Sequence, residues 1–288
     1  MHKTNEPLIS VIINCFNGEK FINKCVHSVL NQTYSNFEII FFDNNSSDKS
    51  LKLIKSIKSR KIRVFKSKKK IKLYHARNKA LKLSKGKFIS ILDIDDTWDK
   101  NKLKKQMNKI CRENSEIIYS NYWIINQSKK IFSKKKLPNK NMTFEILDNY
   151  PICISTVLFK KKIFLELKGF DKNFEIIGDY DFFYKVSKKY KFSVLQEPLT
   201  NYLIHDENTT IKKLNVRISE MRKWMKINYE PKYRDQFEKI NQKNLFFECN
   251  YHILNRNIIN FFRSLKKITD VRIRLKLTLK LIYLLIMR

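Results

Sequence analysis

The sequence predicts an α/β fold with a mixed, mostly parallel sheet flanked by helices, followed by a helical C-terminal extension. Short apolar runs alternate with amphipathic segments through residues 8–92, which is typical of β-α units. Apolar residues make up 43% of the 288 residues, enough to bury a core. From about Ile211 the pattern is helical almost throughout.

The first part of the chain holds four short apolar runs that are typical of buried strands: Leu8–Ile13, Phe37–Phe42, Ile62–Phe65 and Phe88–Leu92. The segments between them carry apolar residues at helical spacing and predict helices at Phe21–Leu30, Leu51–Ile57 and 74–84. We expect Asn17 to cap the first helix and Gly86 to close the third. This alternation predicts a parallel sheet with helices on both faces.

The second part has a mixed pattern. It predicts a helix over 100–112, strands at 116–126 and 155–160, a helix over 180–190, and strands at 192–195 and 199–204. Farther on, 245–262 and 265–287 suggest a helical hairpin about a turn near Asn255. We therefore expect a catalytic domain over residues 1–210 and a helical extension over 211–288.

The composition excludes several kinds of site. The chain has only four glycines, too widely spaced for a P-loop or a dinucleotide-binding GxGxxG loop. Its five cysteines are scattered and form no CxxC pair, so a disulfide framework or a Cys-rich zinc site is not expected, and a reducing, cytosolic compartment fits. The net charge of +33 predicts a general attraction to polyanions, including anionic lipid, nucleic acid and nucleotide phosphates.

Two acidic loops follow predicted strands, at residues 43–48 and 93–99. Ligands of parallel sheets bind beyond the carboxyl ends of the strands, where these loops lie. The carboxylates of Asp93, Asp95 and Asp96 repel one another unless a cation sits among them, and such oxygen ligands suit Mg²⁺ or Mn²⁺. The alternative is a solvated acidic turn before the next helix.

Four further residues have both a chemical and a structural interpretation. Arg77, near the start of a helix, can pair with a diphosphate or can be one surface arginine among many. Asp179, just before an aromatic helix, can be a general base or a helix cap, and Asp181 is the second choice for the base. His205, after a predicted strand, can complete a metal site or be structural.

In this order the segments resemble family 2 glycosyltransferases, the inverting nucleotide-sugar enzymes of the GT-A fold, over about residues 7–205. The motifs that carry the resemblance are Pro7–Ile13 with Asn17–Glu19, Ser28–Tyr34, Phe37–Ile40, Asp43–Asp48, Ala76–Asn78, Gly86 and Asp93–Asp96. Gly178-Asp179 stands where many relatives have Glu-Asp, and the chain near His205 is similar to a Tyr-x-x-His ending common in the family.

The resemblance implies roles for individual residues. The implied donor-binding set is Phe16, Asn17, Glu19, Asp43, Asn44, Arg77, Asp93 and Asp95. Within it, Asp43, Asn44 and Phe16 would lie at the nucleobase, Asp93 at the ribose, and Arg77 at the base or diphosphate. Asp95, helped by His205, would hold a Mn²⁺ or Mg²⁺ that bridges the diphosphate, and Asp179 would be the catalytic base.

The implied reaction transfers a hexose or N-acetylhexosamine from a nucleoside-diphosphate sugar, a UDP-sugar first, to a hydroxyl of a glycan or lipid-linked acceptor. Surface polysaccharide or lipooligosaccharide synthesis is the expected context. A sugar nucleotidyltransferase is the second enzyme hypothesis, although it usually needs a glycine-rich loop. A basic nucleic-acid-binding protein is the non-enzymatic one, but acidic loops at the ligand edge disfavour a specific nucleic acid partner.

The C-terminal segment Val271–Met287 alternates basic and apolar residues and ends in an apolar run too short to span a bilayer. Such a helix can lie on an anionic membrane surface or can pack its apolar side on the catalytic domain. We expect membrane contact, and hence a cytoplasmic protein that is peripheral on the inner face of the cytoplasmic membrane.

Overall fold

The structure is a computed structural model that describes residues 6–127, 129–206, 208 and 212–286. The chain divides into two compact units. Unit 1 comprises Met1–Ile146 and Tyr150–His205, and unit 2 comprises Leu147–Asn149 and Asp206–Arg288. Each unit is described by itself.

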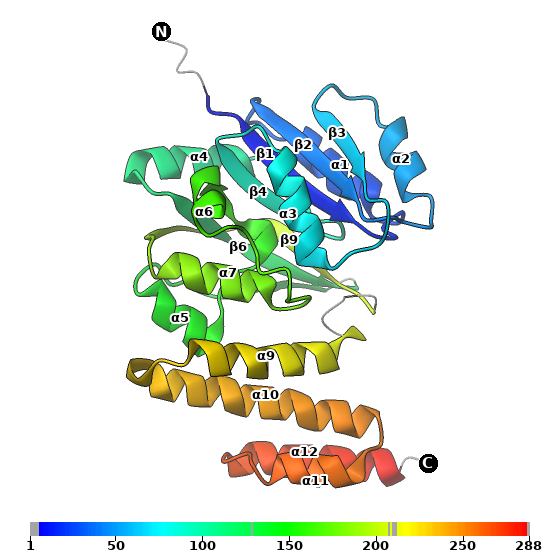
Figure 1. The fold of residues 1–288 in the computed structure, drawn as a ribbon, viewed down its shortest axis with the longest axis vertical. Helices are drawn as coiled ribbons and strands as arrows, with labels where there is room; N and C mark the ends of the chain where they lie inside the picture. Colours follow the sequence, from blue (N-terminus) through cyan, green and yellow to red (C-terminus); the bar gives the residue numbers. More distant parts are fainter. Residues whose placement is uncertain (1–5, 128, 207, 209–211, 287–288) are drawn as a thin grey trace. The chain divides into compact units, whose positions relative to one another are not determined.

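In the described part of unit 1, nine strands form one mixed sheet (Figure 1). The strands are β1 (Ile9–Cys15), β2 (Phe37–Asp43), β3 (Ile62–Lys66), β4 (Phe88–Asp93), β5 (Thr97–Trp98), β6 (Ile117–Asn126), β7 (Lys129–Phe132), β8 (Leu158–Lys160) and β9 (Phe192–Ile204). Their order is β3-β2-β1-β4-β8-β6-β9-β5, with β7 paired to β6. Strands β1 to β4 run parallel, whereas β8 is antiparallel to β4 and β6.

The register of the parallel strands creates the ligand edge. Cys15 of β1 pairs with Asp43 of β2, and Asn14 pairs with Asp93 of β4. The three strands therefore end level with one another, and the loops that follow them meet at one edge of the sheet.

Both faces of the parallel strands are covered by helices, which is why β1 and β2 are buried and mostly apolar. The helices that lie within unit 1 are α1 (Ile22–Leu30), α2 (Ser50–Ser56), α3 (Leu73–Leu83), α4 (Lys102–Glu113), α6 (Lys161–Glu166) and α7 (Gly178–Ser187), with a 3₁₀ turn, η1 (Ile154–Thr156). A further helix, α5 (Met142–Asn149), belongs to unit 1 through Ile146 and to unit 2 from Leu147. Alternate residues of β1, such as Val11 and Ile13, share a core with α1 and α4. Helix α3 packs on β1 and β2, and Figure 1 shows α3, α6 and α7 in front of the sheet.

Two local predictions are wrong. Asn17 does not cap α1, because its side-chain oxygen accepts a hydrogen bond from the backbone N–H of Ser47 at 2.9 Å. Gly86 does not close α3, whose C-cap is Ser84. A Cβ on Gly86 would stand 2.5 Å from the backbone nitrogen of Ser10, so this position is glycine because the chain passes close to β1.

The second half of unit 1 differs from the sequence expectations in its details. Segment 155–160 is a strand only at β8, after the turn η1. Segments 192–195 and 199–204 form one strand, β9, whose pairing with β6 is interrupted near Pro198. The short strands β5 and β7 were not predicted, since two to four residues carry too little pattern.

Unit 2 contains α9 (Leu214–Asn228), the 3₁₀ turn η2 (Pro231–Tyr233), α10 (Arg234–Leu254), α11 (Ile258–Leu265) and α12 (Val271–Ile286). The turn at Asn255 is confirmed, and α10 and α11 share a core on its two sides, as the predicted hairpin requires. The predicted segment 265–287 differs, because a second break at 266–270 separates α11 from α12. The end of the predicted helix at Met287 lies outside the described residues. In the described chain, no helix combines the length and apolarity needed to cross a bilayer.

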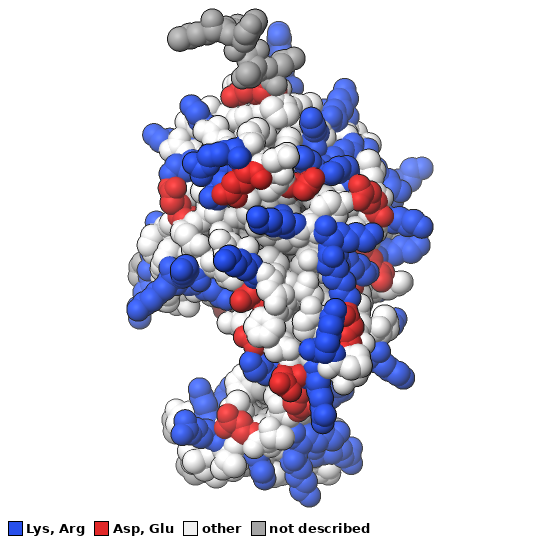
Figure 2. All heavy atoms as spheres, turned by 90° about the vertical axis from the view of Figure 1, so that its left-hand side faces the viewer, with Lys and Arg blue, Asp and Glu red and all other residues white. Residues whose placement is uncertain are grey.

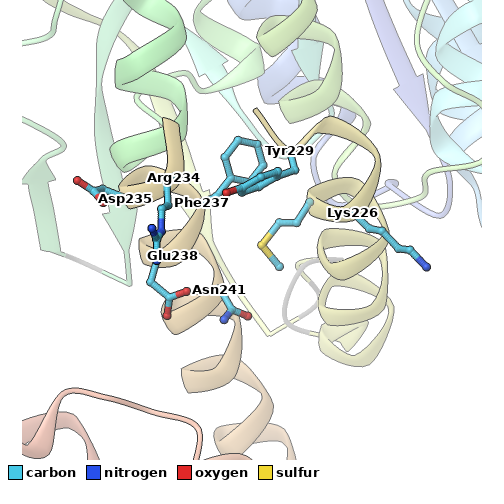
Figure 3. Close-up of a pocket in the computed structure, with 8 residues that line it drawn as sticks. Lys226, Tyr229, Arg234, Asp235, Phe237, Glu238 and Asn241 are labelled. Carbon is cyan, nitrogen blue, oxygen red and sulfur yellow. The ribbon is translucent and has the colours of Figure 1, made fainter. Parts of the chain in front are cut away.

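A hollow of about 830 Å³ opens between α9 and α10 (Figure 3). Its lining combines Met225, Tyr229 and Phe237 with charged side chains of both signs and one amide: Lys226, Arg234, Asp235, Glu238 and Asn241. The lining carries no histidine or cysteine, and none of the residues singled out for chemistry lies in it.

Candidate functional site

The loop after β1 is fastened to the loop after β2. Besides the Asn17–Ser47 bond, a carboxylate oxygen of Glu19 accepts from the backbone N–H of Lys49 at 2.8 Å. The backbone N–H of Glu19 in turn donates to Asp48 at 3.0 Å. The side chains of Asn17 and Glu19 are thus used to shape the ligand edge, and Asn17 takes a left-handed backbone (φ 53°) to do so.

Asp43 and Asn44, at the end of β2, are buried and hydrogen-bonded to neighbouring backbone. Asp43 is fully buried, and its carboxylate accepts the backbone N–H of Ser46 at 3.2 Å. The amide of Asn44 makes two hydrogen bonds to the backbone of Ile71, at 2.8 and 3.1 Å. Asn44 therefore holds the segment that leads into α3.

Phe16 lies at the open rim of this corner. Its ring is exposed, and the ammonium of Lys70 lies 3.5 Å from the ring centroid. An exposed aromatic face beside a lysine is suited to stack on a flat base that carries phosphate nearby.

Arg77 stands on α3 and is buried, with its guanidinium paired to Asp93 at the end of β4. Burial is the largest single influence and lowers the pKa of Arg77, but Asp93, Tyr74 and Asp179 together outweigh it, so the pKa is raised and the guanidinium stays charged. Among the described residues, Nε of Arg77 finds no hydrogen-bond partner. A buried donor left over at a ligand edge is available to an anionic group.

Asp95 and His205 form a second side-chain pair in the site. Nε2 of His205 lies 2.9 Å from Oδ2 of Asp95, and both side chains are about four-fifths buried. Burial and the neighbouring charge of Asp93 raise the pKa of Asp95, and the hydrogen bond to His205 offsets part of this rise.

These two side chains fit a divalent cation that shares its coordination sphere with a ligand. A carboxylate oxygen and an imidazole nitrogen suit Mn²⁺, and the mutual repulsion of Asp93, Asp95 and Asp96 favours a cation at this loop. Within the described part of the chain, no group of three or more His, Cys, Asp or Glu side chains forms a metal site. A cation here would therefore need a diphosphate or water for its remaining ligands.

Asp96 turns away from its two neighbours into the core. Its carboxylate accepts from the hydroxyl of Ser155 at 2.6 Å and from the backbone N–H of Leu203 at 3.1 Å. Burial and the charges of Asp95 and Asp93 raise the pKa of Asp96 well above its ordinary value. Ser155 also accepts the backbone N–H of Asp93 at 3.1 Å, so it anchors the whole acidic loop.

Asp179 sits in the first turn of α7, held between two tyrosines. The hydroxyl of Tyr74 donates to Oδ1 at 2.7 Å, and that of Tyr150 donates to Oδ2 at 2.9 Å. Burial, followed by the charge of Asp179, raises the pKa of both tyrosines, so both remain donors at neutral pH. Asp181 instead is buried and lies 2.6 Å from Nζ of Lys185.

The absence of a side chain at Gly178 belongs to this arrangement. A Cβ there would stand 2.5 Å from the ring of Tyr74, closer than any real contact. The ring of Tyr74 also faces Arg77, 5.1 Å from its guanidinium carbon. Tyr74 thus joins Asp179 to the Arg77–Asp93 pair, which brings the two ends of the site together.

Next to the Asp95–His205 pair lies a pocket of about 380 Å³. Its lining combines three apolar residues with five polar or charged ones: Lys20, Phe21, Lys24, Asp95, Thr97, Ile125, Asn201 and Leu203. The ring of Phe21 packs 4.9 Å from that of His205.

The structure therefore gathers Arg77, Asp93, Asp95, Asp179 and His205 in one region, and places Phe16, Asp43 and Asn44 at the end of β1 and β2. Sequence reasoning missed Tyr74, Tyr150 and Ser155. Tyr74 lies three residues before Arg77 on the same helix, so its proximity to the site could have been inferred from the sequence. Tyr150 and Ser155 lie far from the other site residues in the sequence, and only the fold brings them to the site.

The sequence profile described as "Glycosyl transferase family 2" matches residues 10–167. An Escherichia coli protein named UDP-Glc:alpha-D-GlcNAc-diphosphoundecaprenol beta-1,3-glucosyltransferase WfgD is 35% identical over 155 residues, 54% of this chain and 61% of that protein. An uncharacterized glycosyltransferase of Haemophilus influenzae is 32% identical over 197 residues, 66% of this chain and 76% of that protein.

Solved structures share the fold. The Staphylococcus aureus TarS fragment 1–349 in complex with UDP-GlcNAc superposes with a TM-score of 0.67 at 19% identity, covering 89% of this chain and 79% of that one. The mannosyltransferase PcManGT of Pyrobaculum calidifontis, in complex with GDP-Man and Mn²⁺, gives a TM-score of 0.64 at 13% identity, covering 98% and 81%. The chain belongs to glycosyl transferase family 2, and it is a glycosyltransferase of the GT-A fold.

Proposed function

We propose that the protein transfers a hexose or N-acetylhexosamine, with inversion, from a UDP-sugar to a hydroxyl of a glycan or lipid-linked acceptor. The observation that carries this proposal is the carboxylate of Asp179, held by Tyr74 and Tyr150 beside the Arg77–Asp93 pair. A direct displacement at an anomeric carbon requires a base for the acceptor hydroxyl close to a positive charge for the leaving diphosphate. In this proposal Asp179 is the base and the guanidinium of Arg77 supplies the positive charge.

In the proposed reaction, Asp179 accepts the proton of the acceptor hydroxyl as the oxygen attacks the anomeric carbon. The bond from that carbon to the phosphate oxygen breaks, and its electron pair leaves with UDP. The attack comes from the face opposite the leaving group, so one displacement inverts the configuration. The fixed charge of Arg77 favours the negative charge that develops on the leaving diphosphate.

The donor would lie along the ligand edge. Phe16 would stack on the base beside Asp43 and Asn44, in the corner that Asn17 and Glu19 shape, and Asp93 would meet the ribose. A Mn²⁺ or Mg²⁺ would be held by Asp95 and His205, and it would neutralise charge on the diphosphate. The UDP-GlcNAc bound to TarS and the UDP-Glc in the name of WfgD support UDP as the nucleotide.

The acceptor would place the enzyme at a membrane. The name of WfgD specifies a sugar linked to diphosphoundecaprenol, and relatives named chondroitin synthase and hyaluronan synthase make polysaccharides. A nucleotide sugar is dissolved in water, whereas a lipid-linked acceptor is held in a bilayer. We therefore infer a cytoplasmic enzyme, peripheral on the inner face of the cytoplasmic membrane, working in surface polysaccharide or lipooligosaccharide synthesis.

The test is nucleotide release from a donor panel: UDP-glucose, UDP-galactose, the two UDP-N-acetylhexosamines and GDP-mannose, each with Mn²⁺, Mg²⁺ or a chelator. We expect turnover of a UDP-sugar only with metal. Asp95→Asn should abolish it, whereas Asp99→Asn should not, because the carboxylate of Asp99 accepts the backbone N–H of Asn101 at the start of α4. Preference for GDP-mannose would overturn the nucleotide assignment, and undiminished turnover by Asp95→Asn would overturn the metal assignment.

A further inference from the structure

Unit 2 contains a second apolar stripe that its own core does not use. Leu277 and Leu281 of α12 are buried in the core that α10, α11 and α12 share, and Ile273 packs against this core. Four other apolar residues of the helix lie on a separate face.

That face carries Val271, Leu275, Leu279 and Ile282, at intervals of four, four and three residues, which places them on one side of a helix. All four are exposed, Leu275 by 60% and Leu279 by 57%. The preceding helix α11 likewise exposes its own apolar residues, Ile258, Ile259 and Phe262. Exposed apolar residues repeated along both helices mark an interaction surface.

The charges around the two helices are almost all positive. Between Leu254 and Ile286 the chain has eight lysines and arginines and a single acidic residue, Asp270. The carboxylate of Asp270 caps α12, accepting backbone N–H groups of Arg272 and Ile273 at 2.8 and 3.2 Å. Arg272 and Lys276 are exposed and flank the stripe on the helix surface.

We propose that α11 and α12 dock on an anionic lipid bilayer, with the stripe of Val271, Leu275, Leu279 and Ile282 inserted between the headgroups. An apolar stripe bordered by cations matches the interface of an anionic membrane, in which the acyl boundary lies beneath negative headgroups. A second copy of the chain is the poorer partner, because two such faces would bring like charges together. The inference goes beyond the proposed transfer reaction and shares with it only the location of the acceptor.

The test is co-sedimentation of the full chain with vesicles of phosphatidylglycerol and phosphatidylcholine, compared with phosphatidylcholine alone. No donor or acceptor is present, so a wrong transfer assignment cannot affect the result. We expect binding to the anionic vesicles only. The pair Leu275→Glu and Leu279→Glu should reduce it about tenfold or more. The matched control is Leu165→Glu with Ile227→Glu, two equally exposed residues elsewhere, which should bind like the wild type.

A second pair of double variants distinguishes the contribution of the positive charges to vesicle binding from that of the apolar residues. Arg272→Gln with Lys276→Gln should weaken binding about tenfold or more, whereas Lys52→Gln with Lys55→Gln on α2 should change it little. Circular dichroism confirms that each variant keeps its helices. The proposal is overturned if the Leu275/Leu279 variant binds as the wild type does, or if its only effect is to convert an oligomer into a monomer.

Discussion

At the scale of single residues, the site depends on how its carboxylates are partnered. Asp95 meets a histidine, Asp96 is tied into the core by Ser155, Asp179 accepts from two tyrosines, and Asp181 lies beside a lysine. In the proposed reaction, the different partners of these aspartates therefore give Asp95 and Asp179 chemical roles, and Asp96 and Asp181 structural ones.

In the proposed reaction, Tyr74 and Tyr150 position the carboxylate of Asp179, so removing either hydroxyl should slow the chemical step. Tyr74→Phe removes one hydrogen bond to a charged group, a contribution of about 1.5–3 kcal/mol. We expect kcat to fall about tenfold to a hundredfold, with KM for the donor little changed, and Tyr150→Phe to act similarly. Steady-state kinetics at saturating acceptor measures both constants.

Tyr190→Phe is the control for this prediction, because the hydroxyl of Tyr190 bonds Glu166 on the surface, away from the site. If Tyr74→Phe instead raised KM and left kcat unchanged, the tyrosine would belong to donor binding and not to the positioning of the base.

At the scale of elements, α7 and α3 fit together only because residue 178 has no side chain. Gly178→Ala would push a Cβ to 2.5 Å from the ring of Tyr74. We expect the free energy of unfolding to fall by about 1–3 kcal/mol and transfer to be lost, because the helix start that carries Asp179 must move. Urea denaturation and a transfer assay measure the two effects.

A second change distinguishes the two effects of Gly178→Ala. Combining it with Tyr74→Leu makes room for the methyl group, so stability should return while activity does not. Recovery of both would show that Tyr74 does nothing beyond filling space.

The buried carboxylate of Glu38, near the start of β2, links three neighbouring segments of the chain. It accepts from the hydroxyl of Ser10 at 2.7 Å, the backbone N–H of Lys85 at 2.6 Å and Arg63 at 2.7 Å. Burial raises the pKa of Glu38, but these donors together outweigh it and lower the pKa below its ordinary value of 4.5. The charged form therefore stabilises the fold above pH 4.5, and this contribution disappears as the pH falls through the lower, folded-state pKa.

Glu38→Gln should accordingly lower the free energy of unfolding at pH 7 by about 1–3 kcal/mol. The difference from the wild type should shrink as the pH falls below about 4. Glu116→Gln, which breaks only surface ion pairs with Lys160 and Lys162, should cost about 0.5 kcal/mol or less. Denaturant titrations at several pH values check this, and a constant difference down to pH 3 would contradict it.

The sequence predicted those elements whose local pattern agrees with their final environment. The parallel strands β1, β2 and β4 are mostly apolar because both their faces are buried, and this pattern is visible in the sequence. The acidic loops at 43–48 and 93–99 lie at one edge of the sheet because the strands before them run in the same direction. It could not predict that Gly86 serves close packing against Ser10, or that Tyr150 reaches Asp179. Such contacts join residues 29 to 76 positions apart and depend on how the helices dock.

At the scale of the whole molecule, the +33 charge is spread out. On the face that Figure 2 shows, lysines and arginines are scattered, with acidic residues among them, and do not gather in one patch. We expect any binding to duplex DNA to be independent of sequence and to weaken about a thousandfold or more between about 50 and 200 mM salt. Fluorescence anisotropy with two unrelated duplexes checks this, and a salt-resistant preference for one of them would favour a specific nucleic acid partner.

In the proposed reaction, Asp179 acts as the catalytic base and does not bind the donor. The most direct test compares Asp179→Asn with Asp181→Asn for both UDP affinity by calorimetry with Mn²⁺ and the rate of sugar transfer. We predict that Asp179→Asn binds UDP as the wild type does but transfers about a hundredfold to ten thousandfold more slowly, whereas Asp181→Asn retains most of its transfer. Transfer that survives in Asp179→Asn and is lost in Asp181→Asn would contradict the account.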